Sequence, residues 1–198
     1  MTERTMVKCF ERPGKQNTVE VIEVARERLK VGDISHIIVA TSSGRTADEL
    51  VEAIQGMPVK VVAVTLHCGF SKEGISRLSD EAEGRLRSKG VEVVRSSHAL
   101  SGVERSISGK LGGVSRVEVI SETLRSLLGH GFKVCVEATV MAADNGAIPC
   151  GEVEVMVIGG RSQGADTVCV LRPAYSNSFF NLEIREILAI PRVKSGKE

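Results

Sequence analysis

Hydrophobic and polar positions along the chain follow two patterns, short apolar runs and longer stretches with helical spacing. The apolar runs predict strands, and the stretches with an apolar residue every three or four positions predict amphipathic helices. The predicted strands cover 5–10, 35–40, 59–66, 91–95, 133–142, 152–160, 167–173 and 186–190. The predicted helices cover 18–30, 46–55, 78–89 and 115–128, and a loop with a short helix begins at residue 96.

Strands that alternate with helices predict a three-layer α/β/α fold, with a mostly parallel sheet and helices on both faces. Segment 133–142 is the predicted central strand. The last three strands have no helix between them, so we expect antiparallel pairing at one edge of the sheet, with 186–190 as the edge strand. Because no repeat, linker or low-complexity tract interrupts the sequence, we expect a single domain over 1–198.

Composition narrows the classes of function. Hydrophobic residues make up 42% of the chain, which excludes disorder, and the apolar runs are far shorter than the ~20 residues of a membrane span. A net charge of +1 and an aromatic content of 3% argue against nucleic acid and membrane-surface partners. The N-terminus is charged from Glu3 and lacks a secretory apolar stretch, so we expect a cytoplasmic protein.

Five cysteines are spread along the chain without a C-x-x-C pair. We interpret them as buried thiols of a reducing compartment. His67 and Cys68 are adjacent, but no second cluster completes the four ligands of a zinc site. We therefore expect no metal site.

Polar loops follow several of the predicted strands. In a parallel sheet the carboxyl ends of the strands lie at one edge, and ligands bind in the crevice outside them. Glycine, serine, asparagine, histidine and arginine are concentrated in the loops predicted at this edge: 11–17, 41–46, 67–75, 96–102 and 141–149. The sequence thus predicts a ligand site formed by these loops.

Loop 41–46, with the sequence TSSGRT, has the composition of a phosphate site. A helix N-terminus attracts anions through its free backbone N–H groups, and Arg45 adds a charge-assisted donor. Capping is the alternative, because Thr46 and Glu49 have the spacing of a capping box. Capping explains one hydroxyl but not the others or the arginine. The predicted phosphate ligands are Thr41, Ser42, Ser43, Gly44, Arg45 and Thr46.

Two other glycine-containing segments do not match nucleotide-binding motifs. In 102–111 the glycine spacing differs from that of a Walker A loop, and a leucine follows the lysine. Segment 159–164 leads from one strand to another, unlike the dinucleotide fingerprint. Neither motif supports a nucleotide triphosphatase or a Rossmann dehydrogenase.

The four histidines are divided into two groups by their expected roles. His67 and His98 follow strand ends and are candidate acid–base groups, whereas His36 and His130 are interpreted as structural. Two aspartates in glycine-containing loops either orient a polar ligand or form turns: Asp144 and Asp166.

IIVATSSGRTADELVEAI resembles the effector-site segment of the pyruvate kinase C-terminal domain, in which a strand ends in T-x-S-G-R-[ST]-A before a helix. GEVEVMVIGGRSQGADTVCVLRP is similar to the closing hairpin of the same domain. The helix and strand order also agrees over about 16–95. In that family the first segment grips a phosphate of the allosteric sugar bisphosphate, and the hairpin loop folds over this effector.

The resemblance also has limits. The chain has no catalytic barrel, so we do not expect a pyruvate kinase, and segment 96–150 has no counterpart in the resemblance. Taken whole, the chain resembles stand-alone pyruvate kinase α/β-domain proteins of archaea and bacteria, whose associated ligand is flavin mononucleotide (FMN). The resemblance implies a terminal phosphate in loop 41–46 and a ligand body near Asn17, His67, Gly69, Phe70, Met141, Asp144, Gly159, Gly160, Arg161 and Asp166.

Three functions follow from the resemblance. The first is an FMN-binding protein, either an oxidoreductase or a flavin carrier. The second is a regulatory or sensor module that binds a sugar phosphate or another phosphorylated metabolite without catalysis. The third is a structural assembly protein. Because the pyruvate kinase domain takes part in subunit contacts, the resemblance also implies a homo-oligomer.

Overall fold

The computed structural model describes residues 6–194. The strands within this part are β1 (Lys8–Phe10), β2 (His36–Ala40), β3 (Lys60–Thr65), β4 (Glu92–Arg95), β5 (Val155–Gly159), β6 (Thr167–Arg172) and β7 (Glu183–Pro191). The α-helices are α1 (Thr18–Leu29), α2 (Arg45–Ala53), α3 (Asp80–Ser88), α4 (Gly102–Leu111), α5 (Arg116–Leu128) and α6 (His130–Asp144). Two short 3₁₀ helices are η1 (Lys15–Asn17) and η2 (Ser176–Asn181). The strand predicted over 5–10 begins at a residue outside the described part.

The described strands form one sheet in the order β1-β7-β6-β5-β2-β3-β4. They run parallel except for β6, which is antiparallel to both neighbours. The predicted α/β fold, with its mostly parallel sheet and antiparallel pairing of the last three strands, is confirmed. The edge position predicted for 186–190 is wrong, because β1 pairs along the outer side of β7, with Lys8 beside Ala189.

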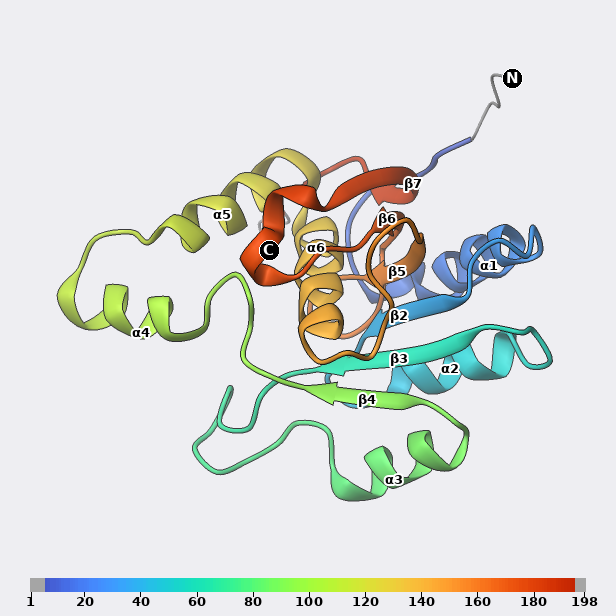
Figure 1. Ribbon diagram of the computed structural model, residues 1–198, viewed down its shortest axis with the longest axis horizontal. Coiled ribbons are helices and arrows are strands. Elements are labelled where there is room, and N and C mark those ends of the chain that lie inside the picture. Colours follow the sequence, from blue (N-terminus) through green and yellow to red (C-terminus); the bar gives the residue numbers. More distant parts are fainter. Residues whose placement is uncertain (1–5, 195–198) are drawn as a thin grey trace.

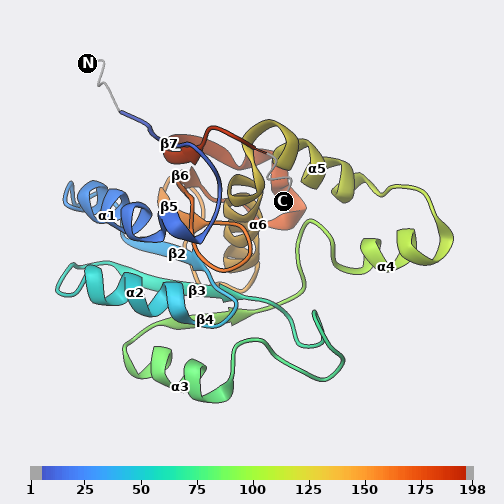
Figure 2. The same cartoon turned by 180° about the vertical axis from the view of Figure 1, so that it is seen from behind.

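Helices cover both faces of the sheet (Figures 1 and 2). Ile37 and Ile38 of β2 point to opposite faces, because side chains alternate along a strand. Ile37 belongs to the core under α1, α2 and α3, where Leu50 is fully buried. Ile38 belongs to the core under α6, which includes Phe132, and α5 packs on the outer side of α6. The sheet is therefore the middle of three layers.

Segment 133–142 was predicted as a central strand and is instead part of α6. Of the fifteen residues of α6, twelve are buried, since the sheet lies on one side and α5 and η2 on the other. A helix buried all round has no polar face, so the periodicity that separates helix from strand is weak. Lys133 and Glu137 provide the helical signal, because residues four apart lie on the same face of a helix.

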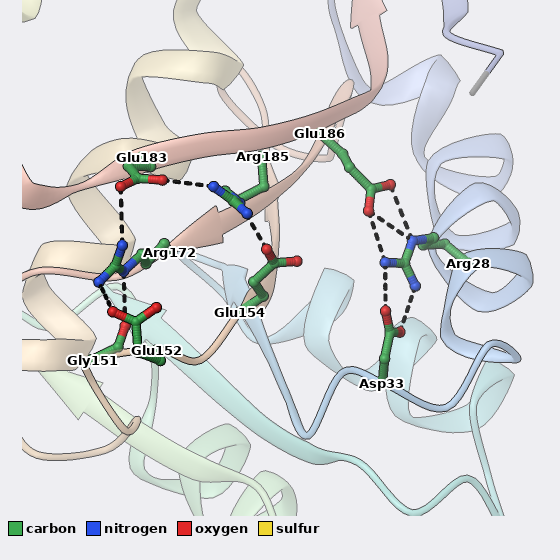
Figure 3. Close-up of polar contacts among 9 residues, drawn as sticks. All are labelled: Arg28, Asp33, Gly151, Glu152, Glu154, Arg172, Glu183, Arg185 and Glu186. Atoms are coloured by element: carbon green, nitrogen blue, oxygen red, sulfur yellow. Dashed lines mark hydrogen bonds and ion pairs between the residues drawn. The ribbon is translucent and has the colours of Figure 1, made fainter. Parts of the chain in front are cut away.

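Ion pairs connect β7 to its neighbours (Figure 3). Arg172 pairs with Glu183 at 3.1 Å, and Arg185 pairs with Glu154 at 2.7 Å. Arg28 of α1, whose side chain is 15% exposed, contacts both Asp33 and Glu186. The same arginine thus joins α1 to the sheet and to the loop that leads into β2.

The order of the strands brings two of the predicted loops together. Loop 41–46 follows β2, and the turn at 160–166 follows β5, which is the neighbour of β2 in the sheet. In the sheet β5 lies on one side of β2 and β3 on the other. The chain leaves β2 toward β3 and leaves β5 toward β6, so the two connections run in opposite directions from the point where β2 and β5 meet. Such a switch point opens a crevice at the carboxyl ends of the strands. Among the described residues, none of the helices has the length and apolar character of a membrane span.

Candidate functional site

A cavity of about 900 Å³ opens at the carboxyl ends of β2 and β3. This volume lies within the range of small-molecule pockets. Its walls come from loop 41–46, the end of β3, the turn at 160–164, and helices α5 and α6. Among the described residues the lining carries three acidic side chains and seven basic ones: Arg45, Arg77, Arg105, Arg125, Lys133, Arg161 and Lys194. This balance favours an anionic ligand.

Hydrogen bonds of backbone N–H groups fix the shape of loop 41–46. The N–H of Thr41 donates to the Val64 carbonyl at 3.0 Å, and the N–H of Gly44 donates to Thr41 Oγ1 at 3.1 Å. Gly44 has a φ of 89°, a left-handed conformation that favours glycine. A Cβ at this position would also lie 3.2 Å from Leu78 Cδ1. The loop therefore turns sharply from β2 into α2, and five of its residues line the cavity: Thr41, Ser42, Ser43, Arg45 and Thr46.

The capping box between Thr46 and Glu49, which was the alternative to a phosphate site, is not formed. Helix α2 begins at Arg45 with Gly44 as its N-cap, and no described side chain makes a capping hydrogen bond there. Glu49 lies instead near Arg45, with Oε1 and Nε 3.6 Å apart. The first turn of α2 therefore presents backbone N–H groups that no side chain caps, which is the arrangement that binds anions.

Thr65, at the end of β3, adds a donor that the sequence did not single out. Its side chain is 2% exposed and lines the cavity. The Oγ1 atom has no hydrogen-bond partner among the described residues. Since Ala40 pairs with Val64, Thr65 lies beside the start of loop 41–46. A buried hydroxyl without a partner is costly, and a ligand oxygen in the cavity would satisfy it.

The turn at 159–166 lies against loop 41–46. Arg45 Nη2 donates to the Gln163 carbonyl at 3.4 Å, and residues 160–164 line the cavity. Close backbone packing fixes this turn, because a Cβ at Gly160 would lie 2.2 Å from the Gly164 carbonyl oxygen. Gly160 and Arg161 are thus the members of the predicted ligand-body set on this wall.

Two predicted ligand-body residues make hydrogen bonds within the protein and do not line the cavity: Asn17 and Asp166. Asp166 is fully buried and accepts hydrogen bonds from the N–H of Gly14 at 3.0 Å and from Thr167 Oγ1 at 2.8 Å. Burial raises the pKa of Asp166 above its ordinary value. The Asn17 amide donates to the Arg12 carbonyl at 2.8 Å. Both side chains lie outside the cavity lining that the described residues form.

The rings of His67, Phe70 and His98 form a cluster beside the cavity. The ring centroids of Phe70 and His98 are 4.9 Å apart, and His67 lies 5.5 Å from each. Phe70 and His98 line the cavity, while His67 and the neighbouring Gly69 lie outside its lining. Burial lowers the pKa of His98, which favours its neutral ring. The structure thus places Phe70 and His98 where a planar ligand could pack against them.

The remaining predicted ligand-body residues lie on α6 or pack against it. Met141 is 3% exposed and lines the cavity, although on a helix rather than after a strand. Asp144 lies at the far end of the same helix and accepts a hydrogen bond from the N–H of Ser176 at 2.9 Å. The prediction that placed Asp144 in a loop at the ligand edge is wrong, because segment 133–142 is helical. Gly159 packs against α6, where a Cβ would lie 2.4 Å from the Gly131 carbonyl oxygen.

Helices α5 and α6 supply a charged wall that the sequence pattern did not indicate. Lys133 and Glu137 line the cavity and are 4% and 6% exposed. Lys133 Nζ and Glu137 Oε2 lie 2.5 Å apart, and Glu137 Oε1 accepts a hydrogen bond from the N–H of Leu100 at 2.9 Å. Burial lowers the pKa of Lys133. The sequence did contain a signal for this pair, because a lysine and a glutamate stand four residues apart within an apolar run.

His130, interpreted from the sequence as structural, lines the cavity at the N-terminus of α6. Burial and the nearby positive charges of Arg125, Lys133 and Arg161 lower its pKa to about 4. This lowered pKa favours the neutral form of the His130 ring. No group of three or more metal-ligating side chains is present in the described part of the chain.

The fold and the cavity together define a three-layer α/β domain whose parallel strands end at a basic cavity of ligand size. The family model described as pyruvate kinase, alpha/beta domain, matches residues 19–171. The chain therefore belongs to the pyruvate kinase α/β domain family, as its resemblance predicted. The matched range includes loop 41–46, most of the closing hairpin and segment 96–150, for which the sequence suggested no counterpart.

Proposed function

We propose that the cavity binds a phosphorylated small molecule, FMN, with its phosphate at loop 41–46. The observation that carries this proposal is the uncapped N-terminus of α2, which opens onto the same cavity as the buried, unpartnered hydroxyl of Thr65. Both features are donors that lack acceptors among the described residues. A phosphate dianion supplies acceptor oxygens to both.

The other residues of loop 41–46 add to this phosphate site. Ser42 and Ser43 bring hydroxyl donors to the cavity wall. Arg45 contacts Glu49 at 3.6 Å and the Gln163 carbonyl at 3.4 Å, both long distances. Exposed ion pairs of this kind contribute little, so a phosphate can replace them. A charge-assisted hydrogen bond from Arg45 to phosphate would contribute about 1.5–3 kcal/mol.

The body of FMN would extend from loop 41–46 toward α6. Phe70 and His98 offer rings for the isoalloxazine, and Met141 offers a polarisable apolar contact. A bound flavin supplies hydride and electron transfer, which the side chains of the protein do not. In an oxidoreductase a second substrate would occupy the α5–α6 side of the cavity, whereas a flavin carrier needs no such substrate.

The absorbance spectrum of the purified protein, and a titration with FMN if the protein is colourless, test this proposal. We expect flavin absorbance bands or saturable FMN binding. The double substitution Ser43→Ala/Arg45→Ala should weaken binding by at least about 100-fold, since it removes a hydroxyl and a charged donor. Arg87→Ala/Ser88→Ala, on α3 and outside the cavity lining, is the matched control and should leave the affinity unchanged. A protein that takes up no flavin contradicts the FMN proposal.

The basic lining favours a second candidate function, a sensor that binds a sugar phosphate or a related metabolite. Seven basic side chains and only three acidic ones exceed what a single phosphate requires. In this case the protein would be colourless, would not bind FMN and would be stabilised thermally by sugar phosphates. The same Ser43→Ala/Arg45→Ala variant should then lose that stabilisation.

A further inference from the structure

One side of α6 faces the cavity and carries two charged residues among apolar ones. The cavity-lining residues of this helix recur every three or four positions, as one face of a helix does: His130, Lys133, Val134, Glu137, Ala138 and Met141. Lys133 and Glu137 are charged, yet they are only 4% and 6% exposed. Burial of an ion pair costs desolvation energy, and apolar side chains of similar volume are often no less stable in its place. The pair is therefore weak evidence for stability and points to another role.

Both oxygens of the Glu137 carboxylate have a partner. Oε2 lies 2.5 Å from Lys133 Nζ, and Oε1 accepts a hydrogen bond from the N–H of Leu100 at 2.9 Å. Leu100 is 3% exposed, so its N–H needs an acceptor within the protein. Lys133 belongs to α6 itself, whereas Leu100 lies in loop 96–101, which joins β4 to α4. Glu137 thus connects this loop to the helix.

Loop 96–101 brings the ring of His98 to the cavity. His98 lines the cavity, and its ring centroid lies 4.9 Å from that of Phe70. The N–H of Ser101 donates to the His98 carbonyl at 3.3 Å, so the two residues close one turn. Leu100 stands within this turn, and its side chain belongs to the core under α6. A displacement of Leu100 would therefore move His98 with it.

We infer that Glu137 is a positioning residue of the cavity: it holds this turn through the N–H of Leu100 and so decides where His98 stands against the planar part of the ligand. Lys133 compensates the buried charge of the carboxylate. The inference rests on the proposed function, because it assigns His98 a ligand ring to pack against. Glu137 acts on the ring end of the ligand and not on its phosphate end, since loop 41–46 is held by hydrogen bonds of its own.

Two double substitutions separate the hydrogen bond from the ion pair. Lys133→Met/Glu137→Gln and Lys133→Met/Glu137→Met both remove the two buried charges and keep side chains of similar volume. Only the glutamine variant retains an acceptor for the N–H of Leu100. Because neither variant leaves an unpaired charge in the protein, we expect both to fold with the circular dichroism spectrum of the wild type.

We expect the methionine variant to bind FMN at least about 10-fold more weakly than the glutamine variant, as measured by isothermal titration. Riboflavin, which has the ring but no phosphate, should show the same ratio, because the hydrogen bond acts on the ring end. Inorganic phosphate, titrated as a probe of loop 41–46, should bind the two variants equally. Equal flavin affinities of the two variants, or a loss of phosphate affinity that matches the loss of flavin affinity, would overturn the inference.

The ring resonances of His98 in NMR spectra test its position without a ligand. Burial lowers the pKa of His98, Lys133, His67 and Arg105 add to this effect, and Glu137 opposes it. Both variants remove the charges of Lys133 and Glu137 alike, so a difference between their His98 resonances reports position and not charge. We expect these resonances, assigned with His98→Asn, to differ between the two variants, and identical resonances would overturn the inference. A wild type that takes up no flavin contradicts the FMN proposal, and the His98 resonances then decide the inference alone.

Discussion

At the scale of single residues, Gly44 decides whether loop 41–46 can turn into α2. Its φ of 89° is unfavourable for any residue with a Cβ, and that Cβ would lie 3.2 Å from Leu78. We expect Gly44→Ala to lower the free energy of unfolding by about 2 kcal/mol. Gly56 is a matched control, because its φ is 83° but nothing lies within 4 Å of its Cβ position. Gly56→Ala should cost about 1 kcal/mol, measured by urea denaturation.

The two glycine variants also differ in their expected effect on the ligand. Gly44→Ala displaces the phosphate loop and should weaken FMN binding, whereas Gly56→Ala lies beyond α2 and should not. Equal costs in stability, or equal FMN affinities, would show that the contact with Leu78 does not constrain the loop.

His130 gives the protein a specific dependence on pH. Its pKa is lowered from the ordinary value of 6.5 to about 4 by burial and by Arg125, Lys133 and Arg161, against the opposing charge of Glu137. The unfolded chain therefore binds the proton at higher pH than the folded protein does. The free energy of unfolding should fall as the pH drops from about 6.5 to about 4, and this contribution should be constant above 6.5.

His130→Asn should remove this part of the pH dependence. The stability of the wild type relative to the variant should decrease between pH 7 and pH 4.5, as measured by urea denaturation at both values. A difference that is the same at the two pH values would mean that His130 is not held in its neutral form.

At the scale of elements, Asp166 connects the turn at 159–166 to the loop before α1. Asp166→Ala would leave the N–H of Gly14 without its acceptor and should lower the free energy of unfolding by about 2 kcal/mol. It should also weaken ligand binding, although Asp166 lies outside the cavity lining, because Gly160 and Arg161 depend on this turn.

Asp144→Ala is the control for this prediction. Asp144 also accepts a backbone hydrogen bond, from Ser176, but at the end of α6 away from the ligand loops. This variant should leave ligand affinity unchanged. If both aspartate variants bind the ligand equally well, the turn at 159–166 does not position the site.

The sequence predicted helices well where apolar and polar residues lie on opposite sides of the helix. Helices α1, α2 and α5 were predicted within a few residues, because each has an apolar and a polar side. The pattern failed for α6, since burial on all sides removes the polar face that identifies a helix. The cavity residues Lys133, Glu137 and His130 were missed as a consequence.

The sequence pattern pointed to cavity-lining residues in loops more readily than to those on helices. Loop 41–46 was found because hydroxyls and an arginine exceeded what capping requires, and most of it lines the cavity. Thr65 could not be found in this way, because a threonine at a strand end is common and its lack of a partner is visible only in the structure.

At the scale of the whole molecule, the topology of the sheet assembles the cavity. β2 and β5 are far apart in the sequence but adjacent in the sheet, so loop 41–46 and the turn at 159–166 meet. Helices α5 and α6 close the opposite side with charged residues of both signs. We therefore expect this cavity to recognise a ligand through its phosphate.

A comparison of FMN with riboflavin, which has the same ring but no phosphate, separates recognition of the phosphate from recognition of the ring. Isothermal titration of the wild-type protein should give an affinity for FMN at least about 100-fold higher than for riboflavin. Ser43→Ala/Arg45→Ala should lower the FMN affinity toward that of riboflavin and leave riboflavin binding unchanged. Equal affinities of the wild type for the two flavins would mean that the cavity does not recognise the phosphate.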